Sequence, residues 1–381
     1  MKAILKLFIS DVHCGKAKNE DVANNLISFL KEMEDMNKLD YLIISGDFFD
    51  GRLSLGSESA VDAYRAIFAM ANLCILNNVK LRWLEGTPRH DRGQIKLFNS
   101  IHPDVFSKLD FKYINTTSIV EEEEGHILYV PDLPSKSTQL TFTEIKELLK
   151  EKSIDKVFGA VVHGGFDFNL KIVGEDGYHR TEDFLSITEH FTVSGHVHKP
   201  AKVDRILIPG SFDRLKFGEE EPKGALLTVE HLDDSSKDEM YFLENKRSKL
   251  FVTFKINSTN INGLIDELMS QISKYDSIHP KKISDDSSIR LILLNDASIL
   301  NTSNLAFEIN NALNSRFDIT IKTEDGLHQE EEEVIDVGIR KTQQINHTNI
   351  KETLSAHLLE KNVSPEIVES VLSLIKGTDT H

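Results

Sequence analysis

The chain has 381 residues, of which 40% are hydrophobic and 28% are charged. This length and apolar content suffice for a sizeable core and favour two domains over one. No run of about 18 apolar residues occurs, and Lys6 interrupts the apolar N-terminus before any small-residue cleavage site, so we expect neither a membrane span nor a signal peptide. The two cysteines, Cys14 and Cys74, give no disulfide framework, which favours a reducing cytoplasm.

The acidic balance limits how the protein can bind nucleic acid. It has 61 acidic against 44 basic residues, and its formal net charge is −17. Proteins that bind DNA by themselves usually present a basic face, so a DNA substrate would need phosphate contacts from another subunit. The acidic runs are expected in solvated loops, at Glu121–Glu124, Glu219–Glu221 and Glu330–Glu333.

The first half of the chain alternates strand and helix signals. Three short runs each end at a polar turn and are predicted as strands, at Ile4–Ser10, Tyr41–Ser45 and Lys80–Glu85. The residues between them repeat apolar side chains at helical spacing, around Val22–Met33 and Tyr64–Met70. This order of elements predicts a layered α/β domain.

Further short apolar runs follow with fewer helical stretches between them. The predicted strands are Leu128–Val130, Val157–Val162, Phe191–Ser194, Arg205–Ile208 and Ala225–Val229. They predict a second sheet packed on the first, within a domain at 1–245.

The pattern changes near residue 245. Residues 246–325 are predicted as a small α+β domain, with strands at Leu250–Ile256, Ile289–Leu294 and Phe317–Ile321 and helical stripes at 261–272 and 305–313. The polar, acidic residues 326–347 predict a linker. Residues 348–381 predict two short amphipathic helices, because Ser364 fits a helix cap and Pro365 fits the first helical position after it.

Aspartate and histidine gather in clusters that each follow a predicted strand. The clusters are Asp11-Val12-His13, Gly46-Asp47-Phe48-Phe49-Asp50, Gly86-Thr87-Pro88-Arg89-His90-Asp91, His163-Gly164-Gly165 and Gly195-His196-Val197-His198. One cluster alone says little, because a DxH triplet arises by chance and a lone histidine is more often a packed or surface residue. Strand ends are where α/β enzymes place their sites, so the clusters together predict a metal site.

The donor types indicate which metals fit. Carboxylates and imidazoles without thiolates favour manganese, and also suit magnesium, iron or zinc, more than calcium. A carboxylate such as Asp47 can bridge two divalent ions about 3.5–4 Å apart. Such a pair makes a shared water more acidic and neutralises the charge of a reacting phosphate.

The order DxH, GDxxD, GNHD-like, H and GHxH resembles the calcineurin-like metallophosphoesterases. Within them, Gly46–Asp50 and Pro209–Glu219 are similar to segments of SbcD-type nucleases, the bacterial and phage members of the double-strand-break-repair nuclease family. The resemblance implies a four-layer α/β/β/α sandwich, a DNA-facing cap at 246–325 and a C-terminal helix pair at 348–381.

The resemblance also implies an activity and partners. The activity is a metal-dependent double-strand exonuclease and single-strand endonuclease of DNA repair and recombination. The partners are DNA, an SMC-like ATPase of the SbcC type that binds the C-terminal helices, and a second copy of the chain. The location is the cytoplasm of a bacterium or of a phage-infected host.

The resemblance assigns roles to individual residues. One metal ion would be held by Asp11, His13, Asp47 and His198, and the other by Asp47, His163 and His196. His90 matches the catalytic histidine that orients the scissile phosphate or protonates the leaving oxygen. Asp91 would orient His90, and Asp50 would brace the loop of Asp47 or serve as a turn residue.

The third cluster departs from the family pattern. Relatives have GNHD, whose Asn ligates the second metal, whereas this chain has GTPRHD, with no Asn and two extra residues. Thr87 would supply a weaker oxygen ligand, or water would fill the gap. Arg89 would contact a phosphate with two nitrogens or lie in solvent.

Two other functions stay open. The first is a small-molecule or protein phosphatase, or a cyclic-nucleotide phosphodiesterase, of the same superfamily, although such enzymes generally lack the cap-like domain and the terminal helices. The second is a scaffold that kept the fold and lost the chemistry, which the missing Asn favours and the remaining ligand types oppose.

Overall fold

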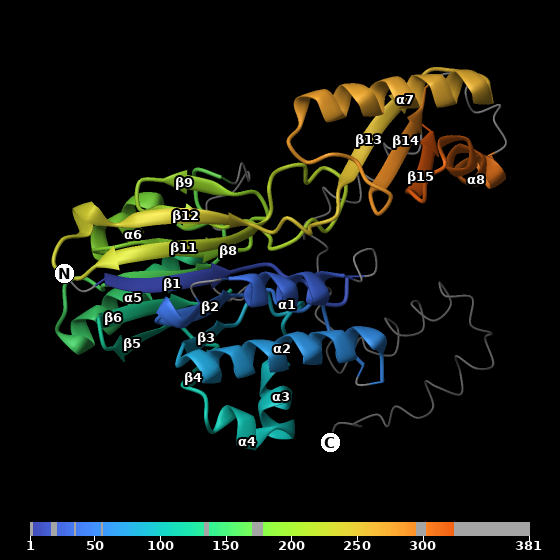
Figure 1. Ribbon diagram of the computed structural model, residues 1–381. Helices are drawn as coiled ribbons and strands as arrows, with labels where there is room; N and C mark the ends of the chain where they lie inside the picture. The colour runs from blue at the N-terminus through green and yellow to red at the C-terminus, as the bar shows by residue number, and fades with distance from the viewer. Residues whose placement is uncertain are drawn as a thin grey trace, which may run out of the picture. The chain divides into compact units, whose positions relative to one another are not determined.

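A computed structural model describes residues 3–16, 21–33, 36–54, 56–132, 137–169, 178–294 and 302–323 (Figure 1). Met1–Ile321 form one compact unit and Lys322–His381 another. The expected acidic linker at 326–347, the helix pair at 348–381 and the acidic run Glu330–Glu333 lie outside the described residues.

The first sheet has six strands in the order β12-β11-β1-β2-β3-β4. Their bounds are β1 Ala3–Ile9, β2 Tyr41–Ser45, β3 Lys80–Leu84, β4 Phe111–Ile114, β11 Gly224–His231 and β12 Glu239–Glu244. Strands β1 to β4 run parallel, and β11 joins β1 antiparallel. The predicted strands at 4–10, 41–45, 80–85 and 225–229 are confirmed, whereas β4 and β12 were missed.

Helices cover one face of this sheet. They are α1 Val22–Glu32, α2 Glu58–Asn77, α3 Ile95–Ile101 and α4 Pro103–Phe106, with a short 3-10 turn at Met36–Lys38. Figure 1 shows α1 and α2 running alongside each other, and they are in contact. Side chains such as Leu26 and Ile67 pack on Leu7, Ile44 and Trp83 of the sheet.

Helix α2 is apolar as well as long. An 18-residue window has a mean hydropathy of 1.3, so by length and composition alone α2 would suffice to cross a membrane. Its alanine-rich face, including Ala63, Ala66 and Ala71, is buried in the core of the domain. Ser57 caps its start by accepting a hydrogen bond from the amide of Ala60, and Asn78 ends it in a left-handed conformation.

The second sheet also has six strands, in the order β5-β6-β7-β8-β10-β9. Their bounds are β5 Ser118–Glu122, β6 Gly125–Val130, β7 Gly159–His163, β8 Thr192–Gly195, β9 Ala201–Val203 and β10 Ile206–Ile208. Helices α5 Thr138–Lys152 and α6 Thr181–Ile187 pack on it through residues such as Ile145 and Phe184. Sequence patterning missed β5, β9 and both helices.

The two sheets share a core of their own. Phe8 and Ile43 of the first sheet pack against Tyr129, Val161 and Leu207 of the second. Neighbouring residues on one strand alternate between this core and the helix-covered core, as side chains of a strand do. The protein is therefore an α/β sandwich, with helices on the outer faces of two packed sheets.

The region after residue 245 has a separate small core. It contains β13 Phe251–Ile256, α7 Ile261–Ile278, β14 Ser288–Leu293, α8 Thr302–Leu313 and β15 Asp318–Thr323. The three strands form one sheet, in which β13 and β14 run parallel. Leu264 and Leu268 of α7 pack against Val252, Phe254 and Leu291 of the sheet. The predicted α+β composition of this region is confirmed.

The acidic run Glu121–Glu124 is not simply a solvated loop. Both oxygens of Glu122 accept hydrogen bonds from Arg82, at 2.7 and 2.8 Å, and Glu124 lies 3.2 Å from the ammonium of Lys6. The side chains of Glu122 and Glu124 are 4% and 1% exposed. The prediction of a solvated run is wrong at Glu122 and Glu124, because the fold brings these cations opposite them, whereas Glu121 and Glu123 are exposed.

Candidate metal centre

The predicted site residues all follow strands of the two sheets. Asp11 and His13 follow β1, Asp47 and Asp50 follow β2, Thr87, Arg89, His90 and Asp91 follow β3, His163 ends β7, and His196 and His198 follow β8. Because β1, β2 and β3 are parallel neighbours, and so are β7 and β8, their carboxyl ends meet at one edge. The loops also bond to each other: the amides of Asp11 and His13 each donate to the 46–47 loop at 3.1 Å.

Several candidate ligands have left-handed backbones. The φ angle is 50° at Asp11, 51° at His13, 50° at Asp47 and 86° at His196. Such angles cost a non-glycine residue on the order of 1–3 kcal/mol and persist only where the surroundings hold them, and they concentrate at functional sites. The strain therefore marks this edge of the sandwich independently of the side-chain chemistry.

Two glycines allow the loops to approach closely. A Cβ at Gly86 would lie 2.1 Å from the amide nitrogen of Asp47, and a Cβ at Gly46 would lie 2.1 Å from Nδ1 of His163. No side chain fits at such distances. The small residues beside the clusters are therefore required for the donor groups to come together.

The first group of donors consists of Asp11, His13 and His198. One donor atom from each lies within 4.8 Å of the other two, and Asp47 Oδ2 is 3.9 Å from His13 Nε2. His13 is 2% exposed, and its Nε2 has no hydrogen-bond partner among the described residues. A buried imidazole nitrogen that faces carboxylates and makes no hydrogen bond is suited to be a metal ligand.

The second group consists of Asp47, His163 and His196, again with donor atoms within 4.8 Å of one another. Asp47 Oδ2 lies 3.3 Å from His163 Nε2, so the same oxygen faces a histidine of each group. The hydroxyl of Thr87 is 3.2 Å from Asp47 Oδ2 and 3.5 Å from His163 Nε2. Thr87 therefore places a hydroxyl oxygen beside both Asp47 and His163.

Hydrogen bonds on the far side of the rings orient two of these histidines. His163 Nδ1 is 2.7 Å from the carbonyl oxygen of Ser45, and His13 Nδ1 is 2.9 Å from Asp50 Oδ1. A ring whose Nδ1–H donates to oxygen presents the lone pair of Nε2 on the opposite side. Both Nε2 atoms face Asp47, as a metal ligand set requires.

Glu219 orients a third histidine, and sequence reasoning missed it. Its carboxylate lies 2.7 Å from His198 Nδ1, and Glu219 is only 5% exposed. The prediction that Glu219–Glu221 lies in a solvated loop is wrong at this residue. The sequence did show that Pro209–Glu219 is similar to a family segment, but this similarity did not indicate which residue Glu219 contacts.

The expected role of Asp91 is wrong. Its buried carboxylate accepts hydrogen bonds from the amides of Asp47, Phe49 and Gly86, at 3.0, 3.1 and 2.7 Å. Asp91 thus joins two ligand loops instead of bonding to the His90 ring. The side chain turns inward because three amides need an acceptor there, whereas His90 faces the rim.

Asp50 is the carboxylate that faces His90. Asp50 Oδ1 lies 3.7 Å from His90 Nδ1, and the same oxygen contacts the ring of His13. Asp50, His90 and His13 therefore form a further group of possible metal donors. Arg89 is exposed and has no polar contact with the donor groups in the described part of the chain. The structure therefore brings together every predicted ligand, with Asp50 rather than Asp91 beside His90.

The electrostatics follow from packing acids and imidazoles together. Burial raises the pKa of Asp47, but His163 and His13 lower it more, to well below its usual value. Burial lowers the pKa of His163, but Asp47 raises it to about 10. Burial and the charge of Asp47 raise the pKa of Asp91 to about 8, and burial lowers the pKa of His90. Such a dense set of donors suits a divalent cation.

Comparison with known proteins adds little. No family model matches the chain, and no curated protein matches it. Among the solved structures that match, one crystal structure shares 11% sequence identity over 64% of this chain and 100% of its own, with a TM-score of 0.38. At this identity and score, the likeness adds nothing to the fold described above.

Proposed function

We propose that this protein is a two-metal phosphodiesterase of the calcineurin-like superfamily, and within it an SbcD-type DNA nuclease subunit. The observation that carries the proposal is the position of Asp47, whose Oδ2 faces both His13 and His163. A carboxylate shared by two donor groups is the arrangement that two-metal hydrolases use to hold a pair of ions.

The ligand residues divide as the family resemblance implies. Asp11, His13 and His198 would hold one ion, His163, His196 and the hydroxyl of Thr87 the other, and Asp47 both. Two divalent ions, with manganese first in expectation and magnesium, iron or zinc next, would make a water more acidic and neutralise a phosphodiester. Glu219, Asp50 and the Ser45 carbonyl fix the ring orientations before any ion binds.

His90 is the proposed acid–base group. It lies at the rim, with its ring centroid 4.8 Å from that of His13, and it is more exposed than His13 and His163. Burial lowers its pKa, and the charges of Asp47 and Asp50 oppose that effect. Its position suits protonation of a leaving oxygen or contact with the reacting phosphate.

The remaining proposals concern partners. DNA is the proposed substrate, the small α+β region its cap, and an SMC-like ATPase the partner of the C-terminal residues, in a bacterial or phage-infected cytoplasm. A homodimer is supported by apolar side chains exposed on α2 and α3, namely Val61, Phe68, Leu76, Leu97 and Ile101.

The test is manganese-dependent cleavage of linear duplex and single-stranded DNA, with bis-p-nitrophenyl phosphate run alongside. We expect the full chain to cleave DNA and His90→Ala to lose about 10²–10⁴-fold in rate. Hydrolysis of the small diester without DNA cleavage, even with the partner ATPase added, would reject the nuclease and favour a small-substrate phosphodiesterase. No hydrolysis of either substrate would favour the scaffold.

A further inference from the structure

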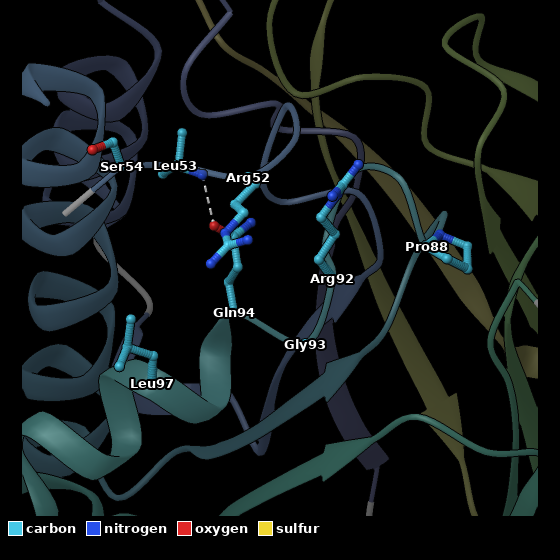
Figure 2. A pocket seen from close by; sticks show the side chains of 8 residues that line it. All are labelled: Arg52, Leu53, Ser54, Pro88, Arg92, Gly93, Gln94 and Leu97. Carbon is cyan, nitrogen blue, oxygen red and sulfur yellow. Dashed lines mark hydrogen bonds between the residues drawn. The ribbon is translucent and has the colours of Figure 1, made fainter. Parts of the chain in front are cut away.

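A pocket of about 920 Å³ opens beside the proposed catalytic loop (Figure 2). One wall is the segment that follows Asp50, and the other is the segment around His90 and the start of α3. The lining residues are Arg52, Leu53, Ser54, Pro88, Arg92, Gly93, Gln94 and Leu97. The metal ligands do not line it, so it is a separate space next to the metal centre.

Hydrogen bonds fix the two walls to each other and to the site. Gln94 accepts from the amide of Leu53 at 2.8 Å, as Figure 2 shows, and donates to the carbonyl oxygen of Gly51 at 2.9 Å. Glu85, at the end of β3, accepts from the amide of Gly93 at 2.5 Å. The pocket therefore has a fixed position relative to Asp50 and His90, which lie on the same two segments.

The pocket carries positive charge that the protein does not neutralise. Arg52 and Arg92 are exposed, and neither has a carboxylate partner in the part of the chain that the structure describes. Among the described residues, Arg92 uses only its Nε, which donates to the carbonyl of Arg89 at 3.1 Å. By contrast, Arg65 and Arg82 have carboxylate partners at 3.1 and 2.7–2.8 Å.

The chemistry of the lining points to a phosphate. A guanidinium binds phosphate oxygens with paired N–H groups, and the pocket is lined by two guanidinium groups that have no carboxylate partner among the described residues, in a chain of net charge −17. Leu53, Pro88 and Leu97 add apolar surface, which suits the sugar of a nucleotide. Arg52 lies two residues beyond Asp50, which contacts His13 and His90, and Arg92 lies two residues beyond His90, the proposed acid–base group.

We propose that this pocket binds a phosphate of the nucleic-acid strand other than the one that reacts, with Arg52 and Arg92 as its ligands. The inference rests on the proposed nuclease function. It deepens that function, because it gives an acidic protein its own binding site for the strand beside the metal centre. The phosphate is either an internal diester or a terminal monoester, and guanidinium groups bind the anionic oxygens of both.

The experiment compares substrates with one phosphate and with several. Steady-state kinetics of the full chain with Mn²⁺ are measured on a single-stranded oligonucleotide and on bis-p-nitrophenyl phosphate, for wild type and Arg52→Ala/Arg92→Ala. We expect the KM for the oligonucleotide to rise by about tenfold or more, since a hydrogen bond to a charged group contributes about a factor of ten to binding. The KM for the small diester should change far less, because its single phosphate cannot occupy the metal centre and the pocket at the same time.

Controls separate charge at the pocket from charge in general. Lys150→Ala/Lys152→Ala removes two charges from the last turn of the outer helix α5 and should leave the ratio of the two KM values as in wild type. Arg52→Lys/Arg92→Lys should recover part of the binding, because the charge remains. The slope of log KM against log salt should fall by about 0.7 for each phosphate that the variant no longer binds.

Substrates with a 5′ or 3′ phosphate, or with hydroxyl ends, identify the source of the phosphate. An equal effect on all of them supports an internal diester, and an effect confined to one phosphorylated end supports a terminal monoester. Wild type that cleaves the oligonucleotide while the double variant keeps its KM and salt slope would overturn the pocket and leave the nuclease intact. Wild type that hydrolyses only the small diester would overturn both.

Discussion

The sandwich contains two buried clusters of charge that differ in one respect. At one end of the inter-sheet core, Lys6 lies 2.8 Å from Glu230 and 3.2 Å from Glu124. At the candidate metal centre, Asp47 faces histidines of two donor groups, and His13 Nε2 has no hydrogen-bond partner among the described residues. In the first cluster one ammonium group faces two carboxylates, whereas in the second the carboxylate and imidazole donor atoms face a common space.

This difference separates a structural ion cluster from a ligand site. Burial of charged side chains does not by itself distinguish them, since Asp11, Asp47 and His163 of one cluster are buried like Lys6 and Glu230 of the other. The distinguishing feature is the left-handed backbone at Asp11, His13 and Asp47, which the residues of the Lys6 cluster do not have. A closed cluster should tolerate replacement by apolar residues as a set, and a ligand site should not.

The largest effect is expected at Asp47. Asp47→Asn weakens the oxygen that faces both donor groups, so hydrolysis of bis-p-nitrophenyl phosphate with Mn²⁺ should be lost. Mn²⁺ should raise the Tm of wild type by binding the folded state and should not raise that of the variant. Asp62→Asn on α2 is the control, because Asp62 pairs with Arg65 on the same helix. Full activity of Asp47→Asn would reject the shared ligand.

The next effect is on stability. Lys6→Met leaves Glu124 and Glu230 buried without their cation, which should lower the free energy of unfolding by about 3–5 kcal/mol. Lys80→Met removes a lysine whose partner Glu123 is 69% exposed, so it should cost about 1 kcal/mol or less. Urea unfolding measures both. Equal losses would mean that the inter-sheet cluster contributes no more than a surface pair.

A smaller effect is expected at Glu219. Glu219→Gln removes the charge that holds His198 Nδ1, and changes of this kind typically lower metal affinity by about 10–100-fold. A Mn²⁺ titration of small-diester hydrolysis measures the shift. Glu221→Gln, two residues on, is the matched control because Glu221 pairs with exposed Lys199 instead. Identical titrations for both variants would contradict the role of Glu219.

The smallest effect is a pH dependence of stability at Glu122, which pairs with Arg82 and Lys112. Burial raises the pKa of Glu122, but Arg82 and Lys112 lower it more, so its folded pKa lies below the unfolded value of about 4.3. The stability that it contributes is present above that unfolded value and is lost as pH falls through the folded pKa. Wild type should therefore lose more unfolding free energy below about pH 4 than Glu122→Gln does. Parallel urea midpoints for the two proteins would refute this assignment.

The sequence predicted the strands that precede the candidate ligands, and the structure brings the side chains of those candidates together. It succeeded because a buried strand followed by Asp or His and glycine is a local pattern, as at β2 and Asp47. It failed for side-chain partners that the fold brings from far away. Glu219 meets His198 across 21 residues, and Arg82 meets Glu122 across 40.

The exchange of roles between Asp50 and Asp91 has the same origin. The side chains of adjacent loop residues, such as His90 and Asp91, point to different sides of the loop. Which of these side chains is buried depends on amide groups that another loop contributes. Short edge strands such as β9 were missed because only three residues carry their signal. The metals, the DNA substrate and the partners stay predictions.

The left-handed backbones at the ligands have a consequence for laboratory evolution. Glycine at His13 would relieve local strain, whereas Asp11 and Asp47 also accept backbone hydrogen bonds, so a stability screen rewards above all the loss of an imidazole that the proposed chemistry uses. Libraries of this protein selected for heat resistance alone would accumulate inactive chains that fold better than their parent. A useful library holds these positions constant and lets the sheet faces and outer helices vary.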